Sequence, residues 1–351
     1  MKIKRIKSFI KKILLVDEGP KPLFLRNQPL PKNSNLKNEF EVCNFGDLNK
    51  DKIFYIIRRT SHAGIFSYLS FVLNHIKIAK INNFIPIIDM ENFTSPYNEK
   101  KKILNTNNSW EYYFNQSCNY SLEEVYRSQN VIFSRTDFHH KMEYRIHLVP
   151  EFQKYKDNEI ILLKNYYKYV DDFFTNKNLH TKKILGVHFR GTSYKTSRGH
   201  IFPATKIQIK NHIDKLLHEE NFDKIYLCTE ESEYLNFFKE YYKDNLLYIE
   251  SFRSNKNDAF TKYPRENHRY LLGDEAVKEA LILSKCQSLL FVRSNIINAA
   301  NYFSNEKQNL YEIFNGFNSR NQFIARWLWF IKKTLPKSFF GLKDEIIKLK
   351  N

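Results

Sequence analysis

Mostly polar residues follow four short apolar segments in the second half of the chain. They are Arg190, Gly191 and Thr192 after ILGVHF, Thr229 and Glu230 after KIYLC, Glu250, Ser251 and Arg253 after NLLYI, and Arg293, Ser294 and Asn295 after SLLFV. A guanidinium offers a rigid fork of donors that matches phosphate oxygens. A helix that starts at Ser294 and Asn295 would present free N–H groups to an anion. The combination predicts a binding site for a nucleoside diphosphate.

The prediction depends on these residues acting together, because each alone has a more ordinary explanation. A strand-end arginine is more often part of a surface ion pair, and Ser-Asn at a helix start is usually only a cap. At an effective dielectric constant of about 20, a guanidinium 4 Å from one phosphate charge contributes ~4 kcal/mol before desolvation. That energy is large enough to matter for a departing diphosphate.

The apolar segments alternate with helical patterns, which predicts a parallel sheet covered by helices. ILGVHF is a near-continuous apolar run, as expected of a strand buried on both faces. Because ligands bind at the carboxyl ends of strands in such sheets, the polar residues above should share one edge. The expected strands are 184–189, 224–228, 245–249, 288–292 and 309–313, and the expected helices run through 209–217, 231–242, 274–285 and 295–303.

An earlier β-α-β pattern indicates a second domain of the same kind. Residues 52–58 (KIFYIIR) and 84–89 (FIPIID) have the pattern of strands, and 65–82 that of a long helix. We therefore expect an α/β protein with two Rossmann-like, doubly wound domains that face a cleft. The N-terminal domain would cover 41–182 and the C-terminal domain 183–318, after a proline-containing linker at 20–40.

Composition narrows the class of protein. The chain has 351 residues, of which 42% are hydrophobic, so a mostly disordered chain is excluded. No apolar run approaches the roughly 20 residues needed to cross a bilayer. The cysteines have no metal-ligand spacing, so we expect neither zinc nor a disulfide framework, and a reducing, cytoplasmic compartment. They are Cys43, Cys118, Cys228 and Cys286.

Both ends of the chain are basic and amphipathic, and the formal net charge is +18. In residues 1–19 an apolar helical stripe lies opposite lysine and arginine side chains. Residues 319–351 form a basic tail with Trp327 and Trp329, and tryptophan favours the bilayer interface. Two interpretations stay open, peripheral contact with an anionic membrane surface or packing of both ends on the protein. Nucleic acid is not expected, because the basic residues are spread along the chain.

Three blocks resemble the fucosyltransferase superfamily, which includes α-1,6-, protein O- and bacterial nodulation fucosyltransferases. The blocks are HFRGTSY (188–194) with GHIFP (199–203), IYLCTEE (225–231), and LLGDEAVKEALILSKCQSLLFVRSNIINAA (271–300). More faintly, RRTSHAGIFSYLS (58–70) resembles the glycine-containing donor loop of that family. The resemblance implies a GT-B architecture and an inverting transfer that needs no metal or cofactor, with GDP-fucose as the usual donor.

The resemblance also implies roles for individual residues. Arg190, followed by Gly191 and Thr192, would grip the diphosphate, and His188 would lie beside the guanosine or phosphate. Arg190 and Glu230 are the expected catalytic residues. The remaining donor-binding residues would be Gly64 in the donor loop, Thr229, Asp274 or Glu275 on the nucleoside side, and Ser294 with Asn295 at the phosphates. No metal site is expected, and we interpret Asp89-Met90-Glu91, the nearest approach to Asp-x-Asp, as structural.

Ser193 departs from the family pattern, because relatives commonly carry an acidic residue after Arg-x-Thr. The difference leaves open the identity of the sugar, or the way in which the acceptor hydroxyl is activated. A general base contributes about 10²–10⁴-fold, although stabilisation of the leaving group can dominate. The candidate bases are Glu230, Asp274, Asp137, His62 and His200.

The leading hypothesis is a glycosyltransferase that moves fucose from GDP-fucose to a glycan or lipid-linked acceptor in bacterial surface-polysaccharide synthesis. The domain at 41–182 would lie on the acceptor side, and the domain at 183–318 would bind the nucleotide sugar. One alternative keeps the fold and uses another GDP-hexose or GDP-heptose. The second alternative is a non-catalytic protein that binds a nucleotide or a nucleic acid.

Overall fold

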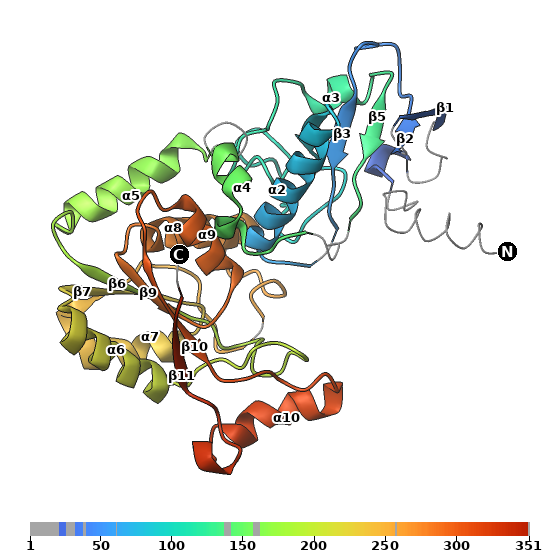
Figure 1. Ribbon diagram of the computed structural model, residues 1–351. Helices are drawn as coiled ribbons and strands as arrows, with labels where there is room; N and C mark the ends of the chain where they lie inside the picture. Colours follow the sequence, from blue (N-terminus) through green and yellow to red (C-terminus); the bar gives the residue numbers. More distant parts are fainter. Residues whose placement is uncertain are drawn as a thin grey trace. The chain divides into compact units, whose positions relative to one another are not determined.

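The computed structural model describes residues 21–25, 32–37, 40–60, 62–136, 142–156, 162–256 and 258–349 (Figure 1). The expected helix at 1–19 and part of the linker at 20–40 lie outside these residues. The chain divides into two compact units. The first comprises Met1–Lys164 with Asn267–Asp274, and the second comprises Asn165–Glu266 with Glu275–Asn351.

The first unit is built on a five-stranded mixed sheet with the strand order β1-β2-β5-β3-β4. Strands β3, β4 and β5 are parallel, whereas β2 is antiparallel to both β1 and β5. Helix α2 packs on β3 and β4. The elements are η1 (Leu23–Leu25), β1 (Lys32–Lys37), β2 (Phe40–Cys43), β3 (Phe54–Ile57), α2 (Ile65–Ile81), β4 (Ile85–Ile88), α3 (Leu122–Val125), β5 (Val131–Phe133), η2 (Ile146–Leu148) and α4 (Pro150–Tyr155).

The β-α-β pattern predicted for residues 52–89 is confirmed as β3, α2 and β4. All four residues of β3 are buried, because its sheet is covered on both faces. Strands β1, β2 and β5 were not predicted. Strands β2 and β5 have only four and three residues, and such short runs carry no measurable alternation of apolar and polar side chains.

The second unit contains a six-stranded sheet with the order β11-β10-β9-β6-β7-β8, in which β6 to β10 are parallel. This is the strand order of the doubly wound, Rossmann-like fold. The elements are α5 (Lys164–Asn176), β6 (Ile184–Phe189), α6 (Lys206–Glu220), β7 (Lys224–Thr229), α7 (Ser232–Tyr242), η3 (Lys243–Asn245), β8 (Leu246–Leu247), α8 (His268–Leu283), β9 (Ser288–Phe291), α9 (Asn295–Phe303), β10 (Asn309–Phe314), α10 (Gln322–Lys332), η4 (Lys337–Phe339) and β11 (Glu345–Leu349).

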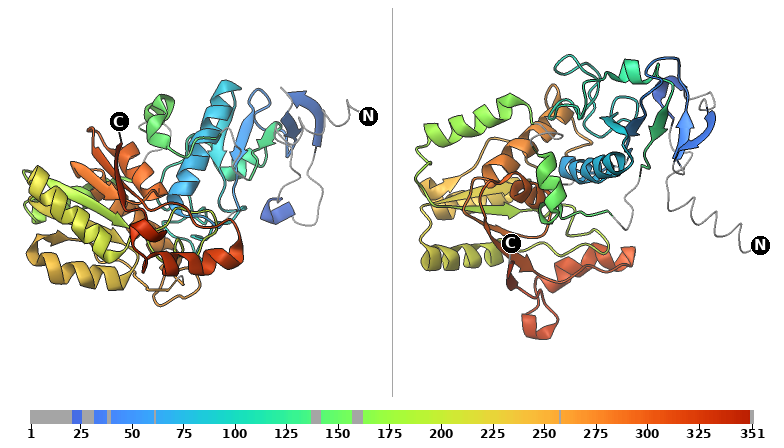
Figure 2. Two further views of the ribbon diagram at one scale, coloured as in Figure 1. Left: turned by 60° about the horizontal axis from the view of Figure 1, so that its bottom comes forward. Right: turned by 45° about the horizontal axis from the view of Figure 1, so that its top comes forward.

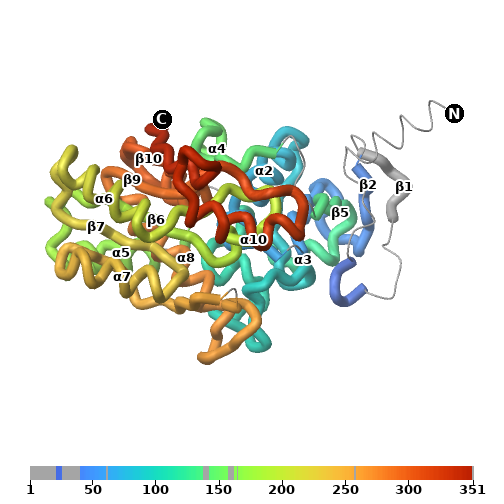
Figure 3. The backbone as a smooth tube through the Cα atoms, turned by 90° about the horizontal axis from the view of Figure 1, so that it is seen from below, coloured from blue at the N-terminus to red at the C-terminus, as the bar shows by residue number. Residues whose placement is uncertain are grey.

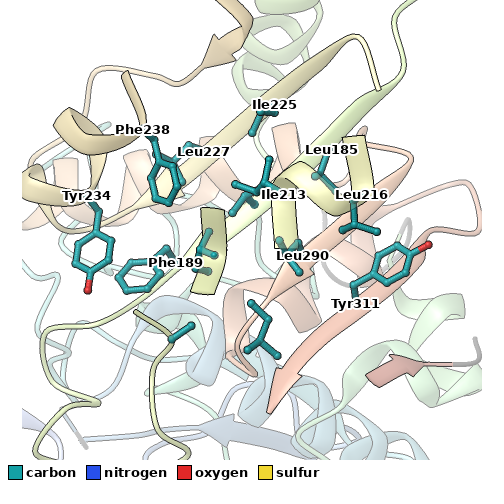
Figure 4. Packing of buried hydrophobic residues seen from close by; sticks show 14 of the residues in the cluster. Leu185, Phe189, Ile213, Leu216, Ile225, Leu227, Tyr234, Phe238, Leu290 and Tyr311 are labelled. Atoms are coloured by element: carbon teal, nitrogen blue, oxygen red, sulfur yellow. The ribbon is translucent and has the colours of Figure 1, made fainter. Parts of the chain in front are cut away.

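Helices α6 and α7 cover one face of this sheet, and α8 and α9 cover the other (Figure 1 and the right-hand view of Figure 2). On the α6 and α7 side, alternate residues of β6 and β7 pack with helix residues in one apolar core (Figure 4). Within it the rings of Phe189 and Tyr234 stack with centroids 3.7 Å apart. On the opposite side, a Cβ at Gly186 would lie 2.6 Å from Leu289 Cδ2 on β9 and 2.9 Å from Leu283 Cδ2 on α8, so a side chain there would have to displace these leucines.

The crossover from β8 to β9 places a topological switch point between β6 and β9. Strands β7 and β8 follow β6 on one side, and the chain then crosses to β9 on the other side. At such a point the loops after the two strands diverge to opposite faces of the sheet and leave room for a ligand outside the carboxyl ends. The ends of β6 and β9 are therefore the first place to look for a site.

Helix α8 is attached to β7 by a buried carboxyl group. Glu279 Oε2 accepts a hydrogen bond from Cys228 Sγ on β7 (3.1 Å), and Glu279 Oε1 accepts one from Ser251 Oγ after β8 (3.2 Å). The Arg253 guanidinium lies 3.7 Å from the same carboxyl group. Burial raises the pKa of Glu279 to about 7, although Arg253 and the two hydrogen bonds act in the opposite direction.

The described part of the basic segment at 319–351 packs on the second unit, which is one of the two interpretations that the sequence left open. Strand β11 pairs antiparallel with β10 and so extends the sheet of the second unit. Helix α10 is anchored by Trp329, which is 4% exposed and packs with Phe202 and Leu342. Trp329 Nε1 also donates a hydrogen bond to the backbone oxygen of Pro203 (2.9 Å). Among the described residues, no helix has the length and apolar character that a bilayer span requires.

We expect Trp329→Ala to lower the free energy of unfolding by about 3–5 kcal/mol, because it removes a buried indole and its hydrogen bond. Trp327 on the same helix is 67% exposed, so Trp327→Ala should change stability by less than about 0.5 kcal/mol. Urea unfolding of both variants measures the difference. Equal effects would show that α10 is not anchored through Trp329.

The free energy of unfolding of the parent protein should fall as pH rises from 5 to 8, and we expect Glu279→Gln to remove the part of this fall that Glu279 causes. The folded protein keeps the Glu279 proton up to about pH 7, whereas an unfolded glutamate releases it near pH 4.3. The folded state therefore binds more protons in this window, and the free energy of unfolding falls as pH rises through it. Relative to the parent, the variant should gain about 2–3 kcal/mol between pH 5 and pH 8.

Urea unfolding at the two pH values tests this expectation. The control is Glu219→Gln on α6, whose carboxylate is 51% exposed and should give no such gain. A parallel pH dependence of the parent and the Glu279→Gln variant would contradict the assignment of the raised pKa to Glu279.

Candidate functional site

A hydrogen bond across the switch point joins the ends of β6 and β9. His188, the fifth residue of β6, is 5% exposed, and its Nδ1 lies 3.2 Å from Ser294 Oγ at the start of α9. Burial, and then the charge of Arg190, lower the pKa of His188 to about 3. The imidazole is therefore neutral at physiological pH, and it contributes a hydrogen bond without adding charge to the site.

The start of α9 is left without a side-chain cap by this arrangement. Ser294 occupies the N-cap position, but its hydroxyl faces His188 and makes no hydrogen bond to the first turn of the helix. Asn295 is the first residue of the helix. Since the first N–H groups of a helix have no partner within the helix, this end is suited to an anion.

Arg190 follows β6 directly and keeps its hydrogen-bond donors unused. Its Nε lies 3.7 Å from Glu230 Oε1, an ion pair in which both side chains are more than one third exposed. The hydroxyl of Thr192 donates to the same oxygen. The Arg190 guanidinium carbon also lies 4.7 Å from the centre of the Tyr194 ring. Within the described residues the guanidinium makes no hydrogen bond, and its Nε is buried without a partner.

The other two strand-end arginines are occupied by the protein itself. Arg253 donates to the backbone oxygens of Thr229 (3.1 Å) and Ile249 (2.8 Å), so its donors hold the loop after β8. Arg293 donates a hydrogen bond from Nη2 to Glu312 on β10 (3.0 Å), a carboxylate that is 1% exposed, while the Arg293 side chain itself is 55% exposed. Of the three, Arg190 is the arginine that makes no hydrogen bond in the part of the chain that the structure describes, although it forms an ion pair with Glu230.

Gly191 is required by a buried ion pair that the sequence analysis missed. A Cβ at this position would lie 2.0 Å from Glu231 Oε1. Glu231 is 1% exposed and accepts hydrogen bonds of 2.8 and 3.0 Å from Lys195 Nζ. Burial raises the pKa of Glu231, and Lys195 opposes that shift. The adjacent acids in IYLCTEE were the available signal, but nothing in the sequence distinguished the buried one from Glu230.

Thr229 is also engaged locally. It is 2% exposed, and its hydroxyl oxygen accepts a hydrogen bond from the backbone N–H of Glu231 (3.2 Å). The predicted residues of the second unit thus have two kinds of position. His188 contacts Ser294 across the ends of β6 and β9, and Glu230 after β7 contacts both Arg190 and Thr192 after β6. Gly191 and Thr229 shape the backbone beside them.

Two predicted donor residues belong to the first unit. Gly64 is the N-cap of α2 with φ −70°, a conformation that does not require glycine, and nothing lies within 4 Å of an added Cβ. Asp274 is 5% exposed on α8, in the segment Asn267–Asp274 that the sequence analysis placed in the C-terminal domain. Their predicted roles toward the donor stay predictions.

The candidate bases are likewise distributed over the chain. Glu230 lies beside Arg190, and the His200 ring lies 5.1 Å from that of Tyr194. Burial, and then the charge of Arg190, lower the pKa of His200. His62 belongs to the first unit, and Asp137 lies outside the described residues.

No group of three histidine, cysteine or carboxylate side chains among the described residues is arranged to hold a metal ion. Asp89, which the sequence analysis interpreted as structural, is fully buried in the first unit. It accepts hydrogen bonds from Tyr126 Oη (2.7 Å) and from the backbone N–H groups of Asn92 (2.8 Å) and Glu91 (3.0 Å).

Comparison with known proteins gives a structural match only. No family model matches the chain, and no curated protein matches it in sequence. The crystal structure of NodZ α-1,6-fucosyltransferase soaked with GDP-fucose has a TM-score of 0.51 and 13% identity, and the match covers 75% of this chain and 95% of that one. Selenomethionine fucosyltransferase NodZ from Bradyrhizobium has the same TM-score and coverage at 14% identity. At this identity the match shows the fold alone: the chain shares the mixed α/β fold of these NodZ fucosyltransferase structures, which agrees with the resemblance noted in the sequence.

Proposed function

We propose that this chain is a glycosyltransferase that binds a GDP-sugar at the carboxyl ends of β6 and β9. The supporting observation is the contrast among the strand-end arginines. Arg253 and Arg293 donate hydrogen bonds within the protein, whereas Arg190, at the end of the central strand, has an ion pair with Glu230 and no hydrogen bond among the described residues. A guanidinium whose donors make no hydrogen bond at a switch point is suited to an anionic ligand, and the uncapped start of α9 follows the neighbouring strand β9.

The reaction that fits this site is the departure of a nucleoside diphosphate. An acceptor hydroxyl attacks the anomeric carbon, the bond to the diphosphate breaks, and the configuration inverts. Arg190 and the N–H groups of α9 would stabilise the charge that develops on the leaving oxygen. Because His188 is neutral, the positive charge beside it comes from Arg190. Glu230 and Thr192 would hold the guanidinium in place, so Arg190 is prearranged for the phosphates.

We extend the proposal to the identity of the sugar donor and of the acceptor. The NodZ structure of the same fold was soaked with GDP-fucose, which favours fucose as the transferred sugar. We further propose a GT-B arrangement of two Rossmann-like domains, a metal-independent transfer, and a glycan or lipid-linked acceptor in bacterial surface-polysaccharide synthesis. Either His200 or Glu230, the candidate bases nearest to Arg190, would take the proton of the acceptor hydroxyl.

A thermal-shift screen with GDP, UDP, CMP and their sugars tests the nucleotide. At 100 times its dissociation constant, GDP should stabilise the protein by about 2.7 kcal/mol, and the other nucleotides should do so far less. Turnover of UDP-sugars without any GDP-sugar would reject the donor. Transfer from another GDP-hexose in preference to GDP-fucose would support the alternative that Ser193 raises. Salt-dependent binding to nucleic acid with no affinity for GDP would favour a non-catalytic protein.

We expect Arg190→Ala to lower kcat/KM by about 10²–10³-fold and to weaken GDP binding while leaving the fold intact. The matched control is Arg198→Ala, because Arg198 is an exposed arginine in the same loop between β6 and α6. Steady-state kinetics, GDP titration calorimetry and circular dichroism measure the three effects. An Arg190→Ala variant that transfers sugar normally would show that the site lies elsewhere.

A further inference from the structure

Helix α10 has two apolar faces, whereas a surface helix needs only one. Ala325 and Trp329, four residues apart, are buried against the second unit. On the other side of the helix lies a second row of apolar residues spaced by four, because each residue rotates the helix by about 100°. This row is Phe323, Trp327 and Ile331, with Ile324 beside it, and these side chains are 79%, 67%, 54% and 51% exposed.

A second exposed aromatic pair follows the helix. Phe339 and Phe340 are 64% and 80% exposed. Lys332 on α10 donates hydrogen bonds to the backbone oxygens of Phe340 (2.5 Å) and Gly341 (3.4 Å), which ties the pair to the helix. Phe340 has φ 59°, in the left-handed region that favours glycine. The backbone thus holds a large apolar side chain outward in a conformation unusual for phenylalanine.

The segment that carries these residues contains charges of a single sign. Between Glu312 and Asp344 the chain has six basic residues and no acidic one. None of the six forms an ion pair within the described residues, although Lys333 is close enough to Glu233 to lower the pKa of that carboxyl group. They are Arg320, Arg326, Lys332, Lys333, Lys337 and Lys343.

We propose that α10 and the Phe339-Phe340 pair dock the protein on the surface of an anionic lipid bilayer. The helix would lie parallel to the membrane, with the row Phe323, Trp327 and Ile331 in the boundary between headgroups and acyl chains. The six cations would contact the anionic headgroups. Helix α10 lies at the surface of the second unit, and it is in front in the view from below (Figure 3). The inference goes beyond the proposed transferase activity and does not depend on it.

A bilayer explains this surface better than a second copy of the chain. In a two-fold dimer the same patch lies on both partners, so its six cations would face six more. An anionic bilayer instead supplies the opposite charge together with an apolar layer of the right depth. Tryptophan, present here in the middle of the exposed row, is enriched at the bilayer interface.

Sedimentation with vesicles tests the proposal on the full chain. The protein should bind phosphatidylcholine vesicles that contain about 30% phosphatidylglycerol, bind pure phosphatidylcholine much less, and lose binding as salt is raised. The double variant Phe323→Ser with Trp327→Ser should weaken binding by roughly tenfold or more. The control replaces two exposed apolar residues elsewhere in the second unit, Ile207→Ser with Phe260→Ser, and should bind as the parent does.

Intrinsic fluorescence locates the contact on α10. Of the three tryptophans, Trp110 and Trp329 are buried, whereas Trp327 is 67% exposed. Anionic vesicles should therefore shift the emission to shorter wavelength. Trp327→Phe should keep binding to the vesicles and lose the shift.

Three outcomes would overturn the proposal. The first is sedimentation with vesicles without a change in emission, which would place the contact in another part of the chain. The second is equal binding to neutral and anionic vesicles. The third is a dimer that the double variant abolishes, together with no vesicle binding by the parent, which would assign the surface to a second copy.

Discussion

The hydrogen bond between His188 and Ser294 determines what the centre of the second unit can do. It connects the end of β6 to the start of α9, the helix that follows β9, and so it spans the switch point between β6 and β9. A serine at the N-cap ordinarily satisfies its own helix. Here the Ser294 hydroxyl is hydrogen-bonded to the buried imidazole instead, so the first N–H groups of α9 have no side-chain cap and can bind a ligand. The neutral state of His188 means that this exchange adds no charge, and Arg190 supplies the cation alone.

The surrounding charges keep Arg190 in that position. Glu231 would be a strong competitor for a guanidinium, but it is buried and saturated by Lys195. Glu230 is closer to solvent and lies 3.7 Å from Arg190 Nε, near enough to attract it without occupying its donors. The adjacent acids Glu230 and Glu231 thus have different partners, Arg190 and Lys195. Gly191 makes this arrangement possible, because only a residue without a side chain leaves room for Glu231.

The regular part of the second unit could be predicted from the sequence because each element has a clear period. Strand β6 and helix α9 have the predicted boundaries, since buried apolar runs and amphipathic repeats are local properties. The partners of Arg253 and Arg293 could not be predicted, because a strand-end arginine looks the same whether it faces a ligand or a buried carboxylate. The pairing of Glu231 with Lys195 depends in the same way on burial that the spacing of residues does not encode.

Strand β11 has a consequence for how the protein avoids self-association. The outer backbone groups of β10 are satisfied by Glu345–Leu349, which reach them only after the roughly thirty residues of the α10 segment. Until that pairing forms, β10 is an open sheet border with apolar side chains such as Leu310 and Ile313, the kind of border on which other chains can add strands. The opposite border is β8, whose two residues offer little template. Pairing of β11 with β10 therefore removes the border of the sheet on which another chain could add a strand.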